Sequence, residues 1–255
     1  MKKICKTWIS SAHQGFVEKD IHSNTLAAYM LAAKKGADMI ETDARMTRDG
    51  ILIANHDDIV RGFDSNGNAI SYVITETNYS DIRKVNLLKE RPDDNFVPTL
   101  EETLHLAYFS GMCVNIDLKE GILHAEKIAK LVVATGMRGR VVYATNASGA
   151  EAINKILEID PDAKFIDTKK NYTKEALQSV KDYPKKCFVY TDDFSDENIK
   201  EIRQSGCMLA AISLNKDNAM AAFKHHPDMA EYPHTSDFET IDAQIINEYW
   251  KLPSR

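Results

Sequence analysis

Carboxylate side chains recur at the ends of short apolar segments in this chain. Glu41 and Asp43 lie two residues apart in an extended segment, so their side chains should point in the same direction. Asp117 follows a later apolar segment. Neighbouring carboxylates repel one another unless a cation lies between them, and oxygen ligands suit a hard cation better than zinc. We therefore predict that Glu41, Asp43 and Asp117 bind one divalent cation, Mg2+ or Ca2+.

Two histidines, His13 and His56, also follow apolar segments. The unperturbed pKa of histidine lies nearest to neutrality among the side chains, so this pair could act as general acid and general base. Taken singly, a histidine, a carboxylate or a lysine such as Lys119 is more often a packed or solvated residue than a functional one. The joint occurrence of these residues at strand ends is what predicts an active site.

The segments that precede these residues predict a parallel β-sheet. Short apolar runs alternate with amphipathic stretches, which is typical of strands that alternate with helices. In a parallel barrel the carboxyl ends of the strands meet on one face, where active sites lie, so the side chains named above should converge. The predicted strands are 8–12, 38–42, 51–55, 113–118, 140–144, 164–167, 187–191 and 208–214. The predicted helices are 25–35, 99–108, 123–134, 149–158, 174–181, 196–204 and 218–225.

The length of 255 residues fits one (β/α)8 barrel, although the alternation alone does not separate a closed barrel from an open doubly wound sheet. No Gly-x-Gly-x-x-Gly follows the first strand and no Walker phosphate loop is present, so nucleotide binding has no support. Residues 60–98 lack the alternation and contain a strong turn signal at residues 64–68. We therefore expect a single TIM barrel domain over residues 1–255, with a small subdomain inserted after the third strand at about residues 60–98.

Composition narrows the range of partners. The net charge of −6 argues against nucleic-acid binding, which depends on a basic surface. No run of about 18 apolar residues is present, so we expect no membrane span. The cysteines match no zinc spacing, which favours reduced thiols in a cytoplasmic protein, with export left open if a leader has been removed. No pattern indicates an oligomeric state.

Several motifs in the first half of the chain occur in a known order. They are His13 and Gly15, Asn24–Leu26, Gly36–Asp43, Thr47–Gly50, His56–Asp57 and Arg61, followed by Val97–Glu102 and Asn115–Lys119. Together they resemble the signature of the glycerophosphodiester phosphodiesterase family. The similarity continues only weakly in the second half, at Ile212–Asn215 and Thr235–Asp237.

This resemblance implies a barrel with an inserted subdomain and a specific reaction. The family hydrolyses a small-molecule glycerophosphodiester to an alcohol and sn-glycerol 3-phosphate. The resemblance implies that His13 and His56 are the acid–base pair and that Lys119 contacts phosphate. It also implies that Glu41, Asp43 and Asp117 are the metal ligands. The nucleophile would be water or the neighbouring glycerol hydroxyl, and either histidine could be the acid.

Several substitutions depart from the family pattern, among them His22–Ser23, which replaces Pro-Glu. Gln14 stands where the family has the Arg of His-Arg-Gly, so this candidate substrate-binding residue offers a neutral amide in place of a charged planar fork. Loss of such a contact costs on the order of 2–4 kcal/mol in transition-state binding. Asp117 replaces a Glu, a change that a Ca2+ site tolerates better than an Mg2+ site. Two alternatives stay open: a weakened or silent barrel that binds phosphate or polyol, and a related phospholipase-like phosphodiesterase.

Overall fold

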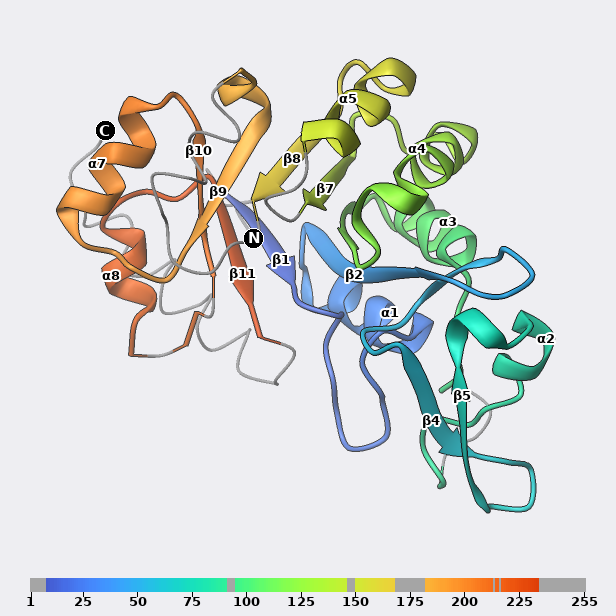
Figure 1. Ribbon diagram of the computed structural model, residues 1–255. Coiled ribbons are helices and arrows are strands. Elements are labelled where there is room, and N and C mark those ends of the chain that lie inside the picture. The colour runs from blue at the N-terminus through green and yellow to red at the C-terminus, as the bar shows by residue number, and fades with distance from the viewer. Residues whose placement is uncertain are drawn as a thin grey trace.

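The computed structural model describes residues 8–90, 95–145, 150–167, 182–212, 214–215 and 217–233. Within these residues eight parallel strands pair in a continuous order, and the pairing of the first strand with the second closes them into a barrel (Figure 1). The predicted (β/α)8 barrel is therefore confirmed. In order around the barrel the strands are β1 (Ile9–Ala12), β11 (Met229–Tyr232), β10 (Met208–Ala211), β9 (Cys187–Thr191), β8 (Lys164–Asp167), β7 (Val141–Thr145), β6 (Cys113–Leu118) and β2 (Met39–Met46).

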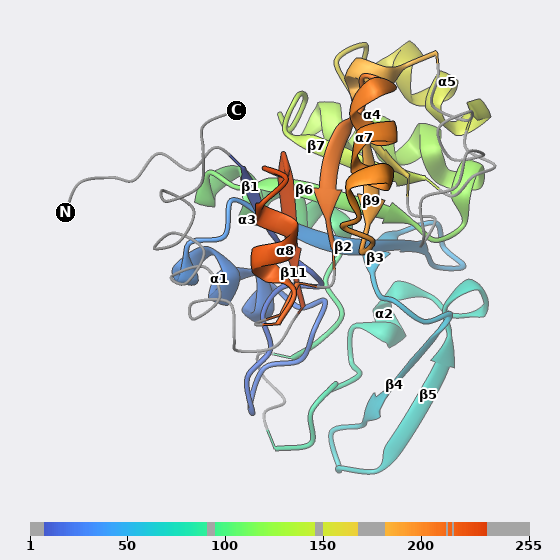
Figure 2. The same ribbon diagram turned by 90° about the vertical axis from the view of Figure 1, so that its left-hand side faces the viewer.

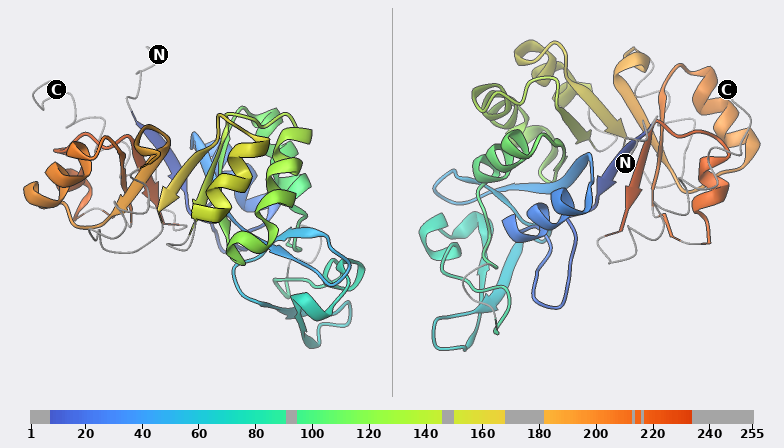
Figure 3. Two further views of the ribbon diagram at one scale, coloured as in Figure 1. Left: turned by 45° about the horizontal axis from the view of Figure 1, so that its top comes forward. Right: turned by 180° about the vertical axis from the view of Figure 1, so that it is seen from behind.

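Helices cover the outside of the barrel. Those coloured green to yellow and those coloured orange to red lie on opposite sides of the strands (Figure 3). They are α1 (Leu26–Lys35), α3 (Leu100–Ser110), α4 (Ala125–Ala134), α5 (Ala150–Ile159), α7 (Asp196–Gln204) and α8 (Ala219–Phe223), while the helix predicted at residues 174–181 lies outside the described residues. No helix in the described ranges is long and apolar enough to cross a membrane.

Alternation along the strands divides the core in two. Successive residues of a strand point to opposite faces, so one set packs against the helices and the other fills the barrel. Ile40 and Val114 belong to the large cluster that includes the helices, whereas Met39, Ile166 and Phe188 belong to a separate cluster of barrel-strand residues. The barrel is therefore a packed core, and a polar site fits only at its mouth.

The predicted third strand is present but lies outside the barrel. β3 (Leu52–Ala54) runs antiparallel to β2, so the expectation that it belongs to the parallel set was wrong. β2 is eight residues long, and only Met39 to Ala44 pair with β6, so its last residues extend beyond the barrel and turn back as a hairpin. The eighth barrel strand is instead β11, which the sequence analysis missed because Met229–Tyr232 is short and contains Glu231.

A small antiparallel sheet forms an insertion after β3. It consists of β4 (Ile59–Phe63) and β5 (Ala69–Val73), followed by the 3-10 turn η1 (Ile74–Glu76) and the short helix α2 (Tyr79–Ile82). This part has its own apolar cluster and projects away from the barrel strands (Figure 2). The turn predicted at residues 64–68 joins β4 to β5, where Asp64 Oδ1 accepts hydrogen bonds from two backbone N–H groups.

The loop between β1 and α1 is tightly packed against the first turn of that helix. Gln14 and Gly15 both adopt positive φ values, of 54° and 77°. The backbone N–H of Phe16 donates to the carbonyl of Ala28 at 3.1 Å. A Cβ added at Gly15 would lie 2.8 Å from the Cβ of Ala28, closer than real carbon atoms approach. Only glycine fits here, and this contact holds the loop that carries His13.

We predict that Gly15→Ala lowers the free energy of unfolding by more than the conformational penalty of a left-handed residue. Gly36→Ala is the matched control, because Gly36 also has a positive φ, of 87°, yet its added Cβ would meet nothing within 4 Å. The control should cost about 1–2 kcal/mol, and Gly15→Ala clearly more, in urea unfolding. Equal losses in the two variants would contradict the proposed close packing of this loop.

Candidate active site

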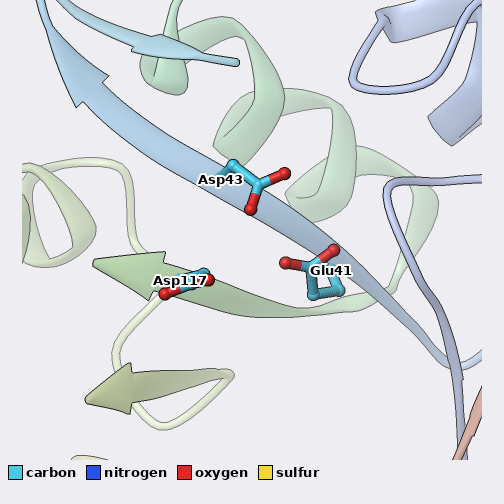
Figure 4. A group of neighbouring side chains, drawn as sticks. All are labelled: Glu41, Asp43 and Asp117. Carbon is cyan, nitrogen blue, oxygen red and sulfur yellow. The ribbon is translucent and has the colours of Figure 1, made fainter. Parts of the chain in front are cut away.

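Three carboxylates converge at the mouth of the barrel. β2 and β6 are neighbours in a register that sets Asp43 opposite Asp117, and Glu41 precedes Asp43 by two residues on the same face. Each of the three offers one oxygen, and these oxygens all lie within 4.8 Å of one another (Figure 4). Glu41 and Asp43 are buried, and Asp117 is partly exposed. The structure therefore brings the three predicted ligands together in a cluster that could hold a metal ion.

Burial makes it costly in free energy for all three carboxylates to be charged at once. Desolvation raises the pKa of Glu41 well above its usual range, and the charges of Asp43, Glu231 and Asp117 raise it further. Desolvation also raises the pKa of Asp117, although Lys119 opposes that shift. Buried carboxylates of this kind favour either protonation or a bound cation. The donor set contains only hard oxygen atoms, so it fits Mg2+ or Ca2+.

Lys119 supplies part of the missing positive charge. Its Nζ lies 2.8 Å from Asp43 Oδ1 and 2.7 Å from Asp117 Oδ2. Desolvation lowers the pKa of Lys119, but the charges of Asp43 and Asp117 outweigh it, so the pKa is raised and the amine stays protonated. The lysine predicted to contact phosphate therefore lies directly beside two of the candidate metal ligands.

Amide groups hold the other oxygen of Asp43. Its Oδ2 accepts from Asn24 Nδ2 at 2.7 Å and from Gln14 Nε2 at 3.0 Å. Asn24 is itself held by Tyr29, whose hydroxyl donates to Asn24 Oδ1 at 2.9 Å. The backbone N–H of Gln14 donates to Glu41 Oε2 at 2.8 Å. Gln14, predicted as a substrate-binding residue, thus also positions two carboxylates of the cluster.

The two histidines line one cavity of about 420 Å³, beside the carboxylates. His13 Nε2 lies 3.9 Å from Glu41 Oε2, and the imidazole is 38% exposed. His56 Nδ1 lies 2.9 Å from Asp57 Oδ1, and this contact orients the ring. The hydrogen bond with His56 is the main reason that the pKa of Asp57 is lowered.

The β2–β3 hairpin explains how His56 reaches this cavity. The backbone N–H of Asn55 donates to the Asp43 carbonyl at 2.9 Å, so the chain after β3 arrives beside the carboxylates. The guanidinium of Arg45 donates to the His56 carbonyl at 2.8 and 2.9 Å and pairs with Glu120 at 2.8 Å. An antiparallel return, rather than the end of a barrel strand, therefore places the second histidine.

A second cavity, of about 250 Å³, also includes His13, Glu41 and Asp117 in its lining. Two residues that the sequence analysis missed line it as well: Tyr190 of β9 and Glu231 of β11. Desolvation is the main reason that the pKa of Glu231 rises to about 7. The signal in the sequence was an acidic residue near the end of an otherwise apolar strand, the pattern that had identified Glu41 and Asp117.

Comparisons with known proteins agree with this geometry. Residues 13–151 match the model of the glycerophosphoryl diester phosphodiesterase family. A probable glycerophosphodiester phosphodiesterase 2 of Mycobacterium tuberculosis is 35% identical over 111 residues, which are 44% of this chain and 38% of that protein. The glycerophosphodiester phosphodiesterase of Bacillus subtilis is 24% identical over 87% of this chain and 84% of its own length. The chain thus spans well under two thirds of the first of these relatives.

Solved structures show the same fold. A putative glycerophosphoryl diester phosphodiesterase of Silicibacter pomeroyi superposes with a TM-score of 0.73 at 18% identity, covering 97% of this chain and 95% of that one. An Oleispira antarctica phosphodiesterase, solved in complex with the product sn-glycerol-3-phosphate, gives a TM-score of 0.72 at 19% identity, covering 93% and 96%.

We predict that Lys119→Met lowers the free energy of unfolding by about 3 kcal/mol in EDTA, because it leaves two neighbouring carboxylates without their cationic partner. Lys130→Met is the matched control, since Lys130 pairs with Glu126 on the surface, where both side chains are more than half exposed. Exposed pairs of this kind contribute about 1 kcal/mol or less. Urea unfolding at pH 7 measures both, and a loss as small as that of the control would contradict the role given to Lys119.

Proposed function

Since this chain belongs to the glycerophosphoryl diester phosphodiesterase family, whose model matches more than half of its residues, we propose that it is an active, metal-dependent member. It would hydrolyse a glycerophosphodiester to an alcohol and sn-glycerol 3-phosphate. The observation that carries the proposal is the convergence of Glu41, Asp43 and Asp117 beside two cavities that share His13. The Oleispira antarctica phosphodiesterase that holds sn-glycerol-3-phosphate supports the assignment of the product.

Glu41, Asp43 and Asp117 would hold the divalent cation. When bound, it would offset the negative charge of the phosphodiester oxygens and orient them. Lys119, already protonated beside two of these carboxylates, lies where its remaining hydrogen-bonding capacity can serve a phosphate oxygen. Lys119 and the cation held by the carboxylate cluster would together make the barrel mouth selective for an anion.

His13 and His56 would transfer protons at opposite ends of the reaction. One removes a proton from the nucleophile, water or the neighbouring glycerol hydroxyl, and the other protonates the departing alkoxide. His13 is placed by the tight β1–α1 loop and lies beside Glu41. His56 is oriented by Asp57 through Nδ1, so Nε2 is the ring nitrogen that would donate or accept the proton. Both rings line the same cavity, as a shared substrate requires.

One observation favours a second function, a barrel that binds phosphate or polyol without turnover. Gln14 stands where the family has an arginine, and its amide is engaged with Asp43 Oδ2 at 3.0 Å. A neutral, engaged amide cannot replace a charged guanidinium at the phosphate. The intact histidine pair and the intact Glu41 and Asp43 favour the enzyme.

We predict that the purified protein hydrolyses glycerophosphocholine or a related glycerophosphodiester, and that EDTA abolishes turnover. Mg2+ or Ca2+ should restore it, because the carboxylate cluster then regains its cation. Release of sn-glycerol 3-phosphate is followed with a coupled dehydrogenase. If the folded protein binds the cation but hydrolyses no diester, the proposed hydrolysis is wrong, and the barrel that binds phosphate or polyol without turnover becomes the better assignment.

We also predict that His13→Ala and His56→Ala each lower kcat by about a hundredfold or more, because proton transfer by a positioned side chain typically contributes that much. His105→Ala is the control, since His105 lies exposed on α3. Thermal unfolding should be little changed in all three variants. Full activity in either catalytic variant would remove that histidine from the mechanism.

A further inference from the structure

A buried polar network lies in the barrel mouth, in the second of the two cavities. Asn115 Nδ2 donates to the hydroxyl of Tyr190 at 3.0 Å, and that hydroxyl donates to Glu231 Oε2 at 2.5 Å. The three residues come from β6, β9 and β11, and their exposed fractions are 1%, 7% and 8%. Tyr190 and Glu231 lie beyond the segment that matches the family model, which ends at residue 151. Two of the three residues, Tyr190 and Glu231, are therefore not covered by the family match, whereas Asn115 lies within it.

The network presents more acceptors than donors. The hydroxyl proton of Tyr190 is used on Glu231, and Asn115 donates to Tyr190. The amide oxygen Oδ1 of Asn115 is buried and has no hydrogen-bond partner among the described residues. Leaving a buried acceptor unpaired costs about 1–3 kcal/mol, so such a group in a cavity points to a ligand that donates to it.

The position of the network in the cavity restricts which part of a ligand can reach it. Glu41 stands opposite Asn115 in the β2–β6 register, and Glu41, Asp117 and the network line the same cavity. A phosphate oxygen placed between Asn115 Oδ1 and the Glu231 carboxylate would meet two acceptors, which repel it. A hydroxyl group can donate to either acceptor. The cavity of about 250 Å³ is several times the ~30 Å³ that one water occupies in the liquid, so it admits more than one such group.

We propose that Asn115, Tyr190 and Glu231 form a polyol subsite, in which Asn115 Oδ1 and the Glu231 carboxylate accept hydrogen bonds from the hydroxyl groups of the substrate. Tyr190 is a positioning residue that orients Glu231. The inference rests on the proposed function for the identity of the phosphate ester, and it deepens that function by assigning the residues that select a hydroxylated substituent. The cation and Lys119 would bind the phosphate, and the network would bind the carbon chain next to it.

The test compares two ligands that differ only in their hydroxyl groups, sn-glycerol 3-phosphate and n-propyl phosphate. Dissociation constants are measured by calorimetry with Ca2+ or Mg2+ present. The wild-type protein should prefer glycerol phosphate by about tenfold or more, since a hydrogen bond to a charged group is typically worth at least that factor. In the double variant Tyr190→Phe/Glu231→Leu this preference should fall severalfold, with the remainder due to Asn115 Oδ1, while the affinity for propyl phosphate stays the same.

The variants are chosen so that a folding defect cannot imitate the expected result. Replacing both partners of the Tyr190–Glu231 hydrogen bond by apolar groups leaves neither of those two groups unpaired, although Asn115 Nδ2 loses the hydroxyl to which it donates. Glu231→Gln keeps one acceptor and should retain part of the preference. Glu126→Gln, which removes an exposed carboxylate on α4, should retain all of it. Thermal unfolding of each variant reports whether the barrel is intact.

Three other outcomes would overturn the subsite. They are no preference for glycerol phosphate in the wild-type protein, an unchanged preference in the double variant, and an equal loss of affinity for both ligands in that variant. Turnover of a glycerophosphodiester is measured separately on the same samples. A protein that shows the hydroxyl preference without turnover would support the subsite and refute the proposed hydrolysis.

Discussion

The structure depends on one electrostatic constraint, the burial of several carboxylates within a few ångströms of one another at the barrel mouth. Desolvation and mutual repulsion disfavour the charged form of such groups, and both effects act on Glu41. The fold provides these carboxylates with ion-pair and hydrogen-bond partners. Lys119 lies against two carboxylates, the backbone N–H of Gln14 reaches Glu41, and the amides of Gln14 and Asn24 hold the second oxygen of Asp43. These contacts orient the oxygens without neutralising all of them, which is the condition in which a cation binds.

The barrel provides the rigidity that this arrangement requires. Carboxylates on neighbouring parallel strands are held by the β2–β6 register, so their separation is set by backbone hydrogen bonds rather than by flexible loops. The two histidines are placed by different means. His13 is held by a loop packed against α1, where only glycine fits at position 15. His56 is carried back to the site by a hairpin whose return strand pairs with β2. Strand ends thus hold the carboxylates, and connecting segments hold the two histidines that we propose to transfer protons.

Gln14 illustrates how a departure from the family pattern can be absorbed. In place of an arginine, the position carries an amide that donates to Asp43 while its backbone N–H donates to Glu41. Both the side chain and the backbone of this residue therefore contact the carboxylate cluster. On the far side of the cluster, Glu231 and Asn115 add polar groups to a cavity that also includes Glu41. These are the groups that we propose to bind the carbon chain of a substrate.

Sequence alone determined the fold class and most of the site, because period and spacing are local properties. Alternation of apolar and amphipathic segments predicted a parallel sheet with helices, and the chain length and the resemblance to the family predicted that the sheet closes into a barrel. The two-residue spacing of Glu41 and Asp43 predicted a shared face. The same local reasoning assigned β3 to the barrel and missed β11, since a short strand interrupted by Glu231 resembles a loop and an antiparallel return resembles a parallel strand. Strand direction and pairing are decided by contacts between distant segments. The hydrogen bonds of Gln14 to the carboxylates and the network of Asn115, Tyr190 and Glu231 join residues that lie 27 to 75 positions apart, so only the tertiary structure could reveal them.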